Sequence, residues 1–350
     1  MLDAIDLAER RWLPDAAVRW GIRRLLRRRL VEQERISGEA AERRTEQFVA
    51  ELRASPLRVA ADEANQQHYE VPAEFFQRCL GRRLKYSCCL FEQPGTTLDE
   101  AEEAMLRLTC QRAQLADGME ILELGCGWGS LSLWMAEHYP NARIVAVSNA
   151  HSQKRFIESR CQQLGLENLQ VITADMADFQ TSRQFDRVVS VEMFEHMRNY
   201  EELLGRIAGW LRPEGKLWVH VFCHRRFAYL FATNGKANWM GRHFFTGGMM
   251  PSADLLPRFQ RHLQLEQQWR VDGTHYGRTA EAWLNNLDAQ RAQIEQVLAA
   301  NLPLSEAKLQ VQRWRMFFMA CAELFSFDGG QQWWVAHYRF GRQKSPRAVD

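Results

Sequence analysis

The middle of the chain alternates between short apolar runs and longer amphipathic stretches. The apolar runs predict strands at residues 120–124, 143–147, 169–173, 186–191 and 216–222. The stretches between them predict helices at about 128–138, 151–164 and 199–211. Such alternation is typical of an open, mostly parallel sheet with helices on both faces. Ligands of these sheets bind beyond the carboxyl ends of the strands, so reactive residues should directly follow the strands.

The pattern changes on both sides of this block. Residues 1 to about 115 read as mostly helical, and Thr97 to Glu100 resembles a capping box that opens a helix through about Ala116. Residues 222–256 are rich in Phe, Gly and Met and are predicted to be an irregular cover over the strand ends. Beyond them the pattern predicts strands at 263–271 and 333–340 and helices at 279–300 and 305–325. We therefore expect a helical N-terminal cap region at residues 1–115 and a ligand-binding core at residues 116–350. Within the core, insertions at 223–260 and 278–326 are expected to cover the substrate.

A glycine-rich loop follows the first predicted strand. Glycine occupies every second position from Gly125 to Gly129, and a helix is predicted to begin near Ser130. Glycine allows a positive φ and a close approach of ligand to backbone, and the helix N-terminus adds unpaired N–H groups. Glu123 stands before the first glycine, where a phosphate loop would favour lysine. The combination suits a ligand that carries a cation, and S-adenosylmethionine, with an ammonium and a sulfonium, fits it.

The residues after the next strands bear on the choice of cofactor. The third glycine comes too early for a dinucleotide loop, and Ser148-Asn149 ends the second strand without the acidic residue that holds a ribose diol. In an S-adenosylmethionine site Asn149 or Gln153 would have to hold the ribose. Asp175, which follows the third strand and precedes Met176, can accept from an adenine amino group. The alternative for Asp175 is a helix cap.

A second group of reactive residues follows the fourth strand. Glu192, Glu195 and His196 would share one face of a turn or helix at spacings i, i+3 and i+4. In a pocket, mutual charge and burial would perturb their pKa values. A carboxylate can bind an ammonium, and a carboxylate or an imidazole can take its proton, which an amine must lose before it attacks a sulfonium methyl. The alternative is a solvated surface cluster, which the preceding apolar strand disfavours.

Composition and charge narrow the class of protein. The chain has 350 residues, 46% hydrophobic and 25% charged, as in ordinary globular proteins. A net charge of +2 gives no reason to expect a nucleic-acid partner. The eight cysteines show no C-x-x-C spacing, so we expect reduced thiols and a cytoplasmic protein. The N-terminus lacks the order of a signal peptide, and no uncharged apolar run reaches membrane-spanning length.

Two other features admit more than one reading. The stretch 19–30 is a basic helix with interleaved apolar residues, which could contact an anionic membrane surface. We favour a helix that packs its apolar stripe on the protein and leaves its arginines in solvent. Cys88, His220 and His224 could in principle bind a metal, but their spacing is poor and no metal site is predicted.

Together these residues resemble the cyclopropane-fatty-acid synthase superfamily of S-adenosylmethionine-dependent methyltransferases, and within it most the plant coclaurine N-methyltransferases. The resemblance runs from about Val71 to Phe340. It is carried by the motifs YSCC at 86–89, ELGCGWGSL at 123–131, EMFEHM at 192–197, VHVFCH at 219–224, FFTGG at 244–248 and VAH at 335–337. It implies a Rossmann-like class I methyltransferase fold with a seven-stranded, mostly parallel sheet.

The resemblance also assigns roles to residues. Cofactor contacts of the family fall on Tyr86, Ser87, Gly125, Gly127, Ser148, Asn149, Gln153, Asp175 and Met176. The residues that handle the amine in the N-methyltransferases fall on Glu192, Glu195 and His196. The ligands that hold a bicarbonate base in lipid cyclopropane synthases match Cys88, Glu195, His220 and Tyr276, so they do not separate the two activities.

Glu192 does help to separate them. The lipid enzymes carry glycine at this place, and a second carboxylate is useful beside an ammonium but not beside an alkene. We therefore expect an N-methyltransferase of a small, tetrahydroisoquinoline-like amine, with a lipid methyltransferase that uses bound bicarbonate as the alternative. The substrate pocket is expected to include Cys88, His220, Phe222, His224, Phe245 and Tyr276. The aromatic cover suits a flat apolar substrate, a fatty acyl chain or plain core packing, and a homodimer is possible.

Overall fold

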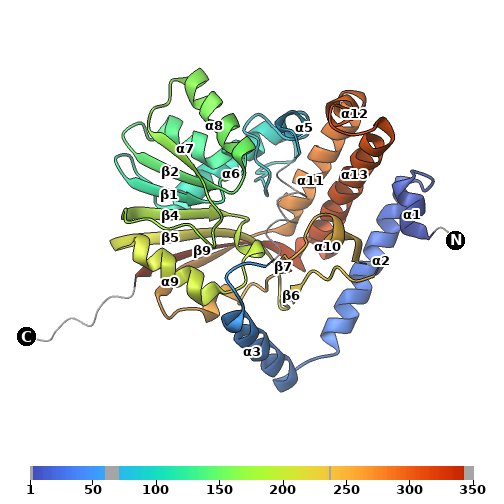
Figure 1. The fold of residues 1–350 in the computed structure, drawn as a ribbon. Coiled ribbons are helices and arrows are strands. Elements are labelled where there is room, and N and C mark those ends of the chain that lie inside the picture. The colour runs from blue at the N-terminus through green and yellow to red at the C-terminus, as the bar shows by residue number, and fades with distance from the viewer. Residues whose placement is uncertain (1–2, 60–70, 236–237, 343–350) are drawn as a thin grey trace, which may run out of the picture.

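The computed structural model describes residues 3–59, 71–235 and 238–342. At its centre is a seven-stranded sheet with the order β3-β2-β1-β4-β5-β9-β8 (Figure 1). Its strands are β1 (Glu120–Leu124), β2 (Arg143–Ser148), β3 (Leu169–Thr173), β4 (Phe185–Val191), β5 (Leu211–His224), β8 (Leu263–Val271) and β9 (Trp333–Arg342). All neighbouring pairs from β3 to β5 are parallel, whereas β9 runs antiparallel to both β5 and β8. The predicted seven-stranded, mostly parallel sheet is confirmed.

Helices cover both faces of this sheet, because the strands of the parallel part bury side chains on both sides. One face carries α6 (Leu98–Ala113), α7 (Ser130–His138) and α8 (His151–Leu164), which share apolar clusters with β1 and β2. The other face carries α9 (Tyr200–Trp210), with α3 (Glu39–Ala54) beside it (Figure 1). Thr97 and Glu100 form the predicted capping box at the start of α6. Because α6 lies directly on the sheet, the predicted boundary at residue 115 separates this helix from the layer to which it belongs.

A helical lobe lies beside the carboxyl ends of the parallel strands (Figure 1). It contains α1 (Ala4–Glu9), α2 (Asp15–Glu34), α5 (Ala73–Cys79), α11 (Gly273–Ala289), α12 (Arg291–Ala299) and α13 (Leu304–Ser326). These helices share one aromatic-rich core with Phe222 at the end of β5 and Trp333 at the start of β9. The N-terminal cap and the second predicted insertion are therefore one packed unit, which reaches the sheet at its ligand-binding edge.

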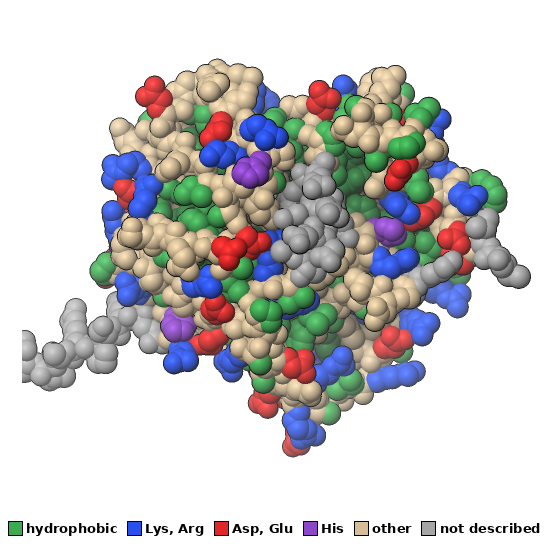
Figure 2. Space-filling model, viewed as in Figure 1, with side chains coloured by type: hydrophobic (Ala, Val, Ile, Leu, Met, Phe, Trp, Pro, Cys, Tyr) green, Lys and Arg blue, Asp and Glu red, His purple; other side chains and the backbone are tan. Residues whose placement is uncertain are grey.

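The basic helix predicted at 19–30 is part of α2. Its apolar side packs into the lobe core through Ile22, Leu26 and Leu30, as the packing interpretation requires. Arginines on its flank pair with acidic residues of the lobe, for example Arg19 with Glu281. Other basic side chains gather on the outer side of the molecule over α2, at the lower right of Figure 2. None of the described helices combines the length and the apolar character needed to cross a bilayer.

Two predicted elements differ in detail from the structure. The helix predicted at 279–300 is two helices that meet at Gln290, and the first begins earlier, where Asp272 caps Thr274. The side chain of Gln290 bonds to both the guanidinium and the carbonyl of Arg78, which holds the corner between the helices. The cover at 222–256 is not wholly irregular, because it contains α10 (Trp239–His243) and the short pair β6 (Tyr229–Leu230) and β7 (Met249–Met250).

Candidate active site

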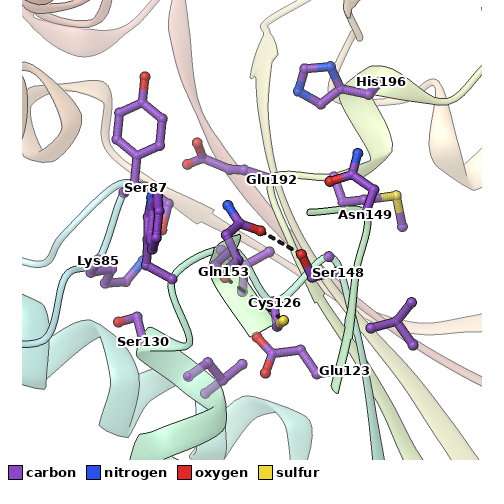
Figure 3. Close-up of a pocket in the computed structure, with 18 of the residues that line it drawn as sticks. Lys85, Ser87, Glu123, Cys126, Ser130, Ser148, Asn149, Gln153, Glu192 and His196 are labelled. Atoms are coloured by element: carbon purple, nitrogen blue, oxygen red, sulfur yellow. Dashed lines mark hydrogen bonds between the residues drawn. The ribbon is translucent and has the colours of Figure 1, made fainter. Parts of the chain in front are cut away.

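A pocket opens at the carboxyl ends of β1, β2 and β4, between the sheet and the helical lobe. Figure 3 shows Glu123 and Ser130 at one end of it and Glu192 and His196 at the other. Most of the residues predicted for the cofactor line this pocket, namely Tyr86, Ser87, Glu123, Gly125, Gly127, Ser148, Asn149, Gln153 and Met176. Asp175 does not.

The glycine loop needs its glycines for two separate reasons. Gly125 and Gly129 both have positive φ, +79° and +81°, which strains any residue with a Cβ. A Cβ on Gly125 would also lie 2.8 Å from Cγ of Met193, and one on Gly129 would lie 2.6 Å from Cγ1 of Ile157. The loop is tied to β2, because the N–H groups of Gly125 and Cys126 both donate to the Val147 carbonyl at 3.0 Å.

Glu123 and Lys85 are buried charged groups at the cofactor end of the pocket. Burial raises the pKa of Glu123 to about 7, and the hydroxyl of Ser132 donates to its carboxylate. The ammonium of Lys85 donates to the hydroxyl of Ser87. The hydroxyl of Ser130 is buried and has no hydrogen-bond partner among the described residues. Sequence reasoning missed Lys85 and Ser130, although Lys85 directly precedes the Tyr86-Ser87 motif, which was the signal that could have found it.

Of the residues expected to bind the nucleoside of the cofactor, Ser148 and Gln153 line the pocket and Asp175 does not. Ser148 donates to the side-chain carbonyl of Gln153 at 2.6 Å, the dashed bond of Figure 3, and both line the pocket. The carboxylate of Asp175 is held outside the lining, by Arg58 at 2.5 Å and by the N–H of Ala177 at 2.8 Å. The bond to Ala177 lies in a turn and not at a helix start, so the helix cap considered from the sequence is not formed. Arg58, which the sequence did not single out, lines the pocket itself.

Glu192 sits at the other end with a strained backbone. Its φ is +47°, in the left-handed region that non-glycine residues rarely adopt. Its carboxylate accepts from the backbone N–H of Cys88 at 3.1 Å, from the imidazole of His220 at 3.1 Å and from the hydroxyl of Tyr276 at 2.6 Å. Strain at one residue persists only where the surroundings over-determine it, and these donors provide that constraint.

Glu195 and His196 do not share a face with Glu192, which corrects the expected spacing. Only Phe194–His196 form a turn, a 3-10 helix, and the left-handed residue Glu192 lies before it. Glu195 points away from the pocket lining into the protein. One of its oxygens accepts from the N–H of Phe222 at 2.9 Å, and the other has no partner among the described residues. His196 does line the pocket, where its ring stacks against Phe245 at 5.7 Å between centroids.

The two glutamates differ in their electrostatics. Burial raises the pKa of Glu192 above its ordinary value, whereas Tyr276, Lys85 and the amide of Cys88 pull it down. Burial and then the charge of Glu192 raise the pKa of Glu195 much further. Two buried carboxyl groups that repel one another do not both ionise readily. The arrangement therefore favours an ionised Glu192, held by donors, and a neutral Glu195 behind it.

The residues predicted for the substrate pocket divide into three groups. Phe222, Phe245 and Tyr276 line the pocket. Cys88 and His220 are buried behind Glu192 and reach the pocket only through its carboxylate. His224 is elsewhere, because its Nδ1 accepts from the backbone N–H groups of Arg226 and Phe227 and so terminates β5. No three His, Cys, Asp or Glu side chains among the described residues gather as metal ligands.

Comparisons with known proteins agree with this geometry. Residues 58–333 match the family described as Mycolic acid cyclopropane synthetase. The chain is 38% identical to (S)-coclaurine N-methyltransferase of Thalictrum flavum subsp. glaucum, over 83% of this chain and 82% of that protein. It is 30% identical to cyclopropane-fatty-acyl-phospholipid synthase of Escherichia coli (strain K12), over 62% of this chain and 54% of that one.

Solved structures show the same order of similarity. A coclaurine N-methyltransferase bound to N-methylheliamine and SAH superposes with a TM-score of 0.92 at 35% identity, covering 96% of this chain and 98% of that one. The cyclopropane synthase MmaA2 from Mycobacterium tuberculosis superposes with a TM-score of 0.70 at 22% identity, covering 82% and 100%, and supports the fold alone.

Proposed function

Since the chain belongs to the mycolic acid cyclopropane synthetase family and is an S-adenosylmethionine-dependent methyltransferase, we propose that it methylates the nitrogen of a small aromatic amine. The family resemblance, the class I fold and the cofactor inferred from the motifs are confirmed. The amine acceptor is supported by relatives named as coclaurine and pavine N-methyltransferases. We expect a primary or secondary amine of the tetrahydroisoquinoline type.

The residues at the cofactor end fit S-adenosylmethionine. Gly125 and Gly127 leave the backbone open to a ligand, and the hydroxyl of Ser130, which has no hydrogen-bond partner within the described part of the chain, is available to it. Glu123 lines the pocket and is proposed to bind the ligand's ammonium. Asn149 and Gln153, which also line it, are the proposed partners of the ribose. When bound, the cofactor supplies an electrophilic methyl group on a sulfonium.

The carboxylate of Glu192 carries the choice of acceptor. It lines the pocket, and three protein donors hold its oxygens in place. An ammonium gains a charge-assisted hydrogen bond from such a carboxylate, whereas an alkene gains nothing from it. Glu192 orients the amine and accepts its proton, so that the free lone pair faces the cofactor. His196, which also lines the pocket, offers a second proton acceptor. Because Glu195 is neutral, Glu192 and Glu195 together carry one negative charge.

The apolar walls favour an aromatic acceptor. Phe222 and Phe245 meet edge-to-face at 5.7 Å, and both line the pocket together with Phe317. Flat ring systems pack well against such faces. The pocket thus pairs aromatic walls with one fixed carboxylate, which is the complement of an arylalkyl ammonium.

The lipid alternative is less well supported. The resemblance matches the residues that hold a bicarbonate base in the lipid enzymes to Cys88, Glu195, His220 and Tyr276. Here the backbone N–H of Cys88, the imidazole of His220 and the hydroxyl of Tyr276 all donate to Glu192, so a side chain takes the place of the external base.

One incubation separates the two functions. The enzyme is supplied with unlabelled S-adenosylmethionine, tetrahydroisoquinoline amines and unsaturated phospholipid vesicles, and the products are read by mass spectrometry. We expect a gain of about 14 mass units on the amine. The same gain on the lipid acyl chain, with no amine product, would overturn the proposal.

A matched pair of variants tests the role of the carboxylate. Glu192→Gln keeps the side-chain shape but cannot take a proton, and should lower kcat/KM by about a hundredfold or more. The control is Glu158→Gln, which removes a solvent-exposed glutamate that pairs with Lys154 on α8. Equal activity of the two variants would refute the assigned role.

A further inference from the structure

Behind Glu192, a chain of hydrogen-bonded side chains (His220, His337 and Arg112) crosses the sheet. Nε2 of His220 lies 3.1 Å from the Glu192 carboxylate, and Nδ1 of His220 lies 3.0 Å from Nε2 of His337. Nδ1 of His337 in turn lies 2.7 Å from the guanidinium of Arg112. The two histidines are directly opposite one another in the antiparallel register of β5 and β9, and both are fully buried. Arg112 comes from α6, on the outer side of the sheet.

Arg112 fixes the donor and the acceptor of every hydrogen bond in this chain. A guanidinium can only donate, so Nδ1 of His337 must accept and the ring carries its proton on Nε2. That N–H then points at Nδ1 of His220, which must also accept. His220 is left with its proton on Nε2 and donates to Glu192. Both rings are neutral, because burial holds the pKa of each well below its ordinary value and the charges of Arg112 and Lys85 act in the same direction.

We propose that Arg112 and His337 are positioning residues for Glu192, which impose one tautomer on the two histidines so that His220 always presents an N–H to the carboxylate. The proposal rests on the proposed function of Glu192. With the opposite tautomer, a lone pair of His220 would face the carboxylate and repel it. The remaining groups that face Glu192 are the amide of Cys88, the hydroxyl of Tyr276, the charge of Lys85 and the carboxyl of Glu195. The ionised carboxylate of Glu192 favours the same tautomer from the Nε2 side, and among the described residues only His337 fixes it from the Nδ1 side.

The environment of Arg112 explains why it holds its position. Its guanidinium lies over the ring of Trp269 at 5.2 Å, and the ring also carries Arg339 at 5.4 Å. Arg339 pairs with Glu266 and donates to the backbone carbonyl of Arg112 at 3.2 Å, but among the described residues its guanidinium makes no hydrogen bond to either imidazole. Both arginines thus pack on Trp269 of β8, but of the two only Arg112 contacts His337. Arg339 is therefore the matched control.

The first test reads the tautomers directly, without turnover. The full-length enzyme is labelled with 15N in its histidine rings, and the signals of His220 and His337 are assigned from single-histidine variants. We expect both rings in the Nε2–H form between about pH 6 and pH 9 in the wild type. Arg112→Met should give His337 a mixture of tautomers, whereas Arg339→Met should leave it unchanged. A wild-type spectrum in Arg112→Met would overturn the proposal, whatever the substrate of the enzyme proves to be.

The second test reads the effect on the reaction. Arg112→Met should lower kcat by about tenfold to a hundredfold and move the acid limb of the kcat profile to higher pH, because a carboxylate that loses a donor is protonated more easily. The KM for S-adenosylmethionine should not change. His337→Gln should recover most of the rate that His337→Leu loses, since a carboxamide can accept from arginine and donate to imidazole.

The outcomes separate this proposal from the proposed function. Wild-type enzyme that methylates no amine refutes the proposed function, and the tautomers still decide the role of Arg112. Active wild-type enzyme with an unchanged pH profile in Arg112→Met refutes the positioning role alone. If His337→Leu does not fold, the histidine spectra of the wild type and of Arg112→Met still test the positioning role of Arg112.

Discussion

At the scale of single residues, the structure holds strain where the chemistry is proposed. Glu192 keeps a left-handed backbone that glycine would adopt freely. Such a conformation costs roughly 1–3 kcal/mol in a non-glycine residue. The resemblance to the lipid enzymes implies glycine at this place in those proteins. The chain therefore retains a strained carboxylate in a cradle where glycine would leave room for an external anion.

This comparison predicts rescue by an external base. Glu192→Gly removes the carboxylate and leaves the amide of Cys88, His220 and Tyr276 as unfilled donors. We expect amine methylation to fall by about a hundredfold or more and to recover in part when bicarbonate is added. Initial rates in sodium bicarbonate are compared with rates in sodium chloride at equal ionic strength and pH. Rates that are equally low in both salts would show that the cradle does not admit an anion.

The raised pKa of Glu123, about 7, predicts how cofactor binding depends on pH. A cationic ligand stabilises the ionised form, so binding must drive off a proton at pH values below 7. Affinity for S-adenosylhomocysteine should thus fall as the pH drops below about 7 and level off above it. Calorimetric titration across this range checks the slope. Glu123→Gln is the control for ionisation of the ligand itself, and an equally steep slope in that variant would contradict the assignment.

At the scale of elements, the glycine loop allows two effects of glycine to be separated. Gly127 and Gly129 both have positive φ, but a Cβ on Gly127 meets no atom within 4 Å, whereas one on Gly129 meets Ile157 at 2.6 Å. Gly129→Ala should therefore destabilise the fold by about 1–3 kcal/mol more than Gly127→Ala. Gly127→Ala should instead weaken cofactor binding, because Gly127 lines the pocket and an added methyl group there would take up open space. Urea midpoints and Kd values for S-adenosylhomocysteine test both statements, and equal midpoints would refute the clash.

Elements of the fold could be predicted where one local rule determines them. The apolar runs fix β1 to β4, and Thr97 with Glu100 fixes the start of α6, since capping and burial act within a few residues. The corner at Gln290 could not be predicted, because it depends on Arg78, more than two hundred residues away in sequence.

The candidate site shows the same division. Glu192 and Gly125 follow strands and Ser148 ends one, so all three could be found from that position alone. The direction of the Glu195 side chain could not, because it depends on an amide of β5 that the sequence does not place. The contact between His220 and His337 depends on the register of β5 and β9, which no local pattern specifies.

At the scale of the whole molecule, the site depends on how the helical lobe docks onto the sheet. Arg315 on α13 is a buried connection within that lobe. It bonds to Asp288 of α11 at 2.8 Å and to Asp15 at the start of α2, also at 2.8 Å. One side chain thus joins the N-terminal helices to the helices that supply Tyr276 and Phe317 to the pocket.

Loss of this connection should loosen the lobe and spare the sheet. Arg315→Met leaves two aspartates without their partner. Because both are partly exposed to solvent, we expect a loss of about 1–3 kcal/mol rather than the full cost of a buried charge. Hydrogen exchange should rise in α2 and α11 and stay unchanged in β1 and β4. The control is Arg28→Met, which breaks an exposed i,i+4 pair on helix α2 and should leave the unfolding midpoint essentially unchanged, because solvent screens the pair.

The same variant connects stability to function. The acceptor end of the pocket takes Tyr276 and Phe317 from the lobe, whereas the glycine loop belongs to the sheet. Arg315→Met should therefore raise the KM for the amine several-fold, because the aromatic walls and the donor to Glu192 become less well ordered. The Kd for S-adenosylhomocysteine should change by less than about twofold. Equal losses for amine and cofactor would mean that lobe and sheet form one cooperative unit, and that the lobe does not hold the acceptor end separately.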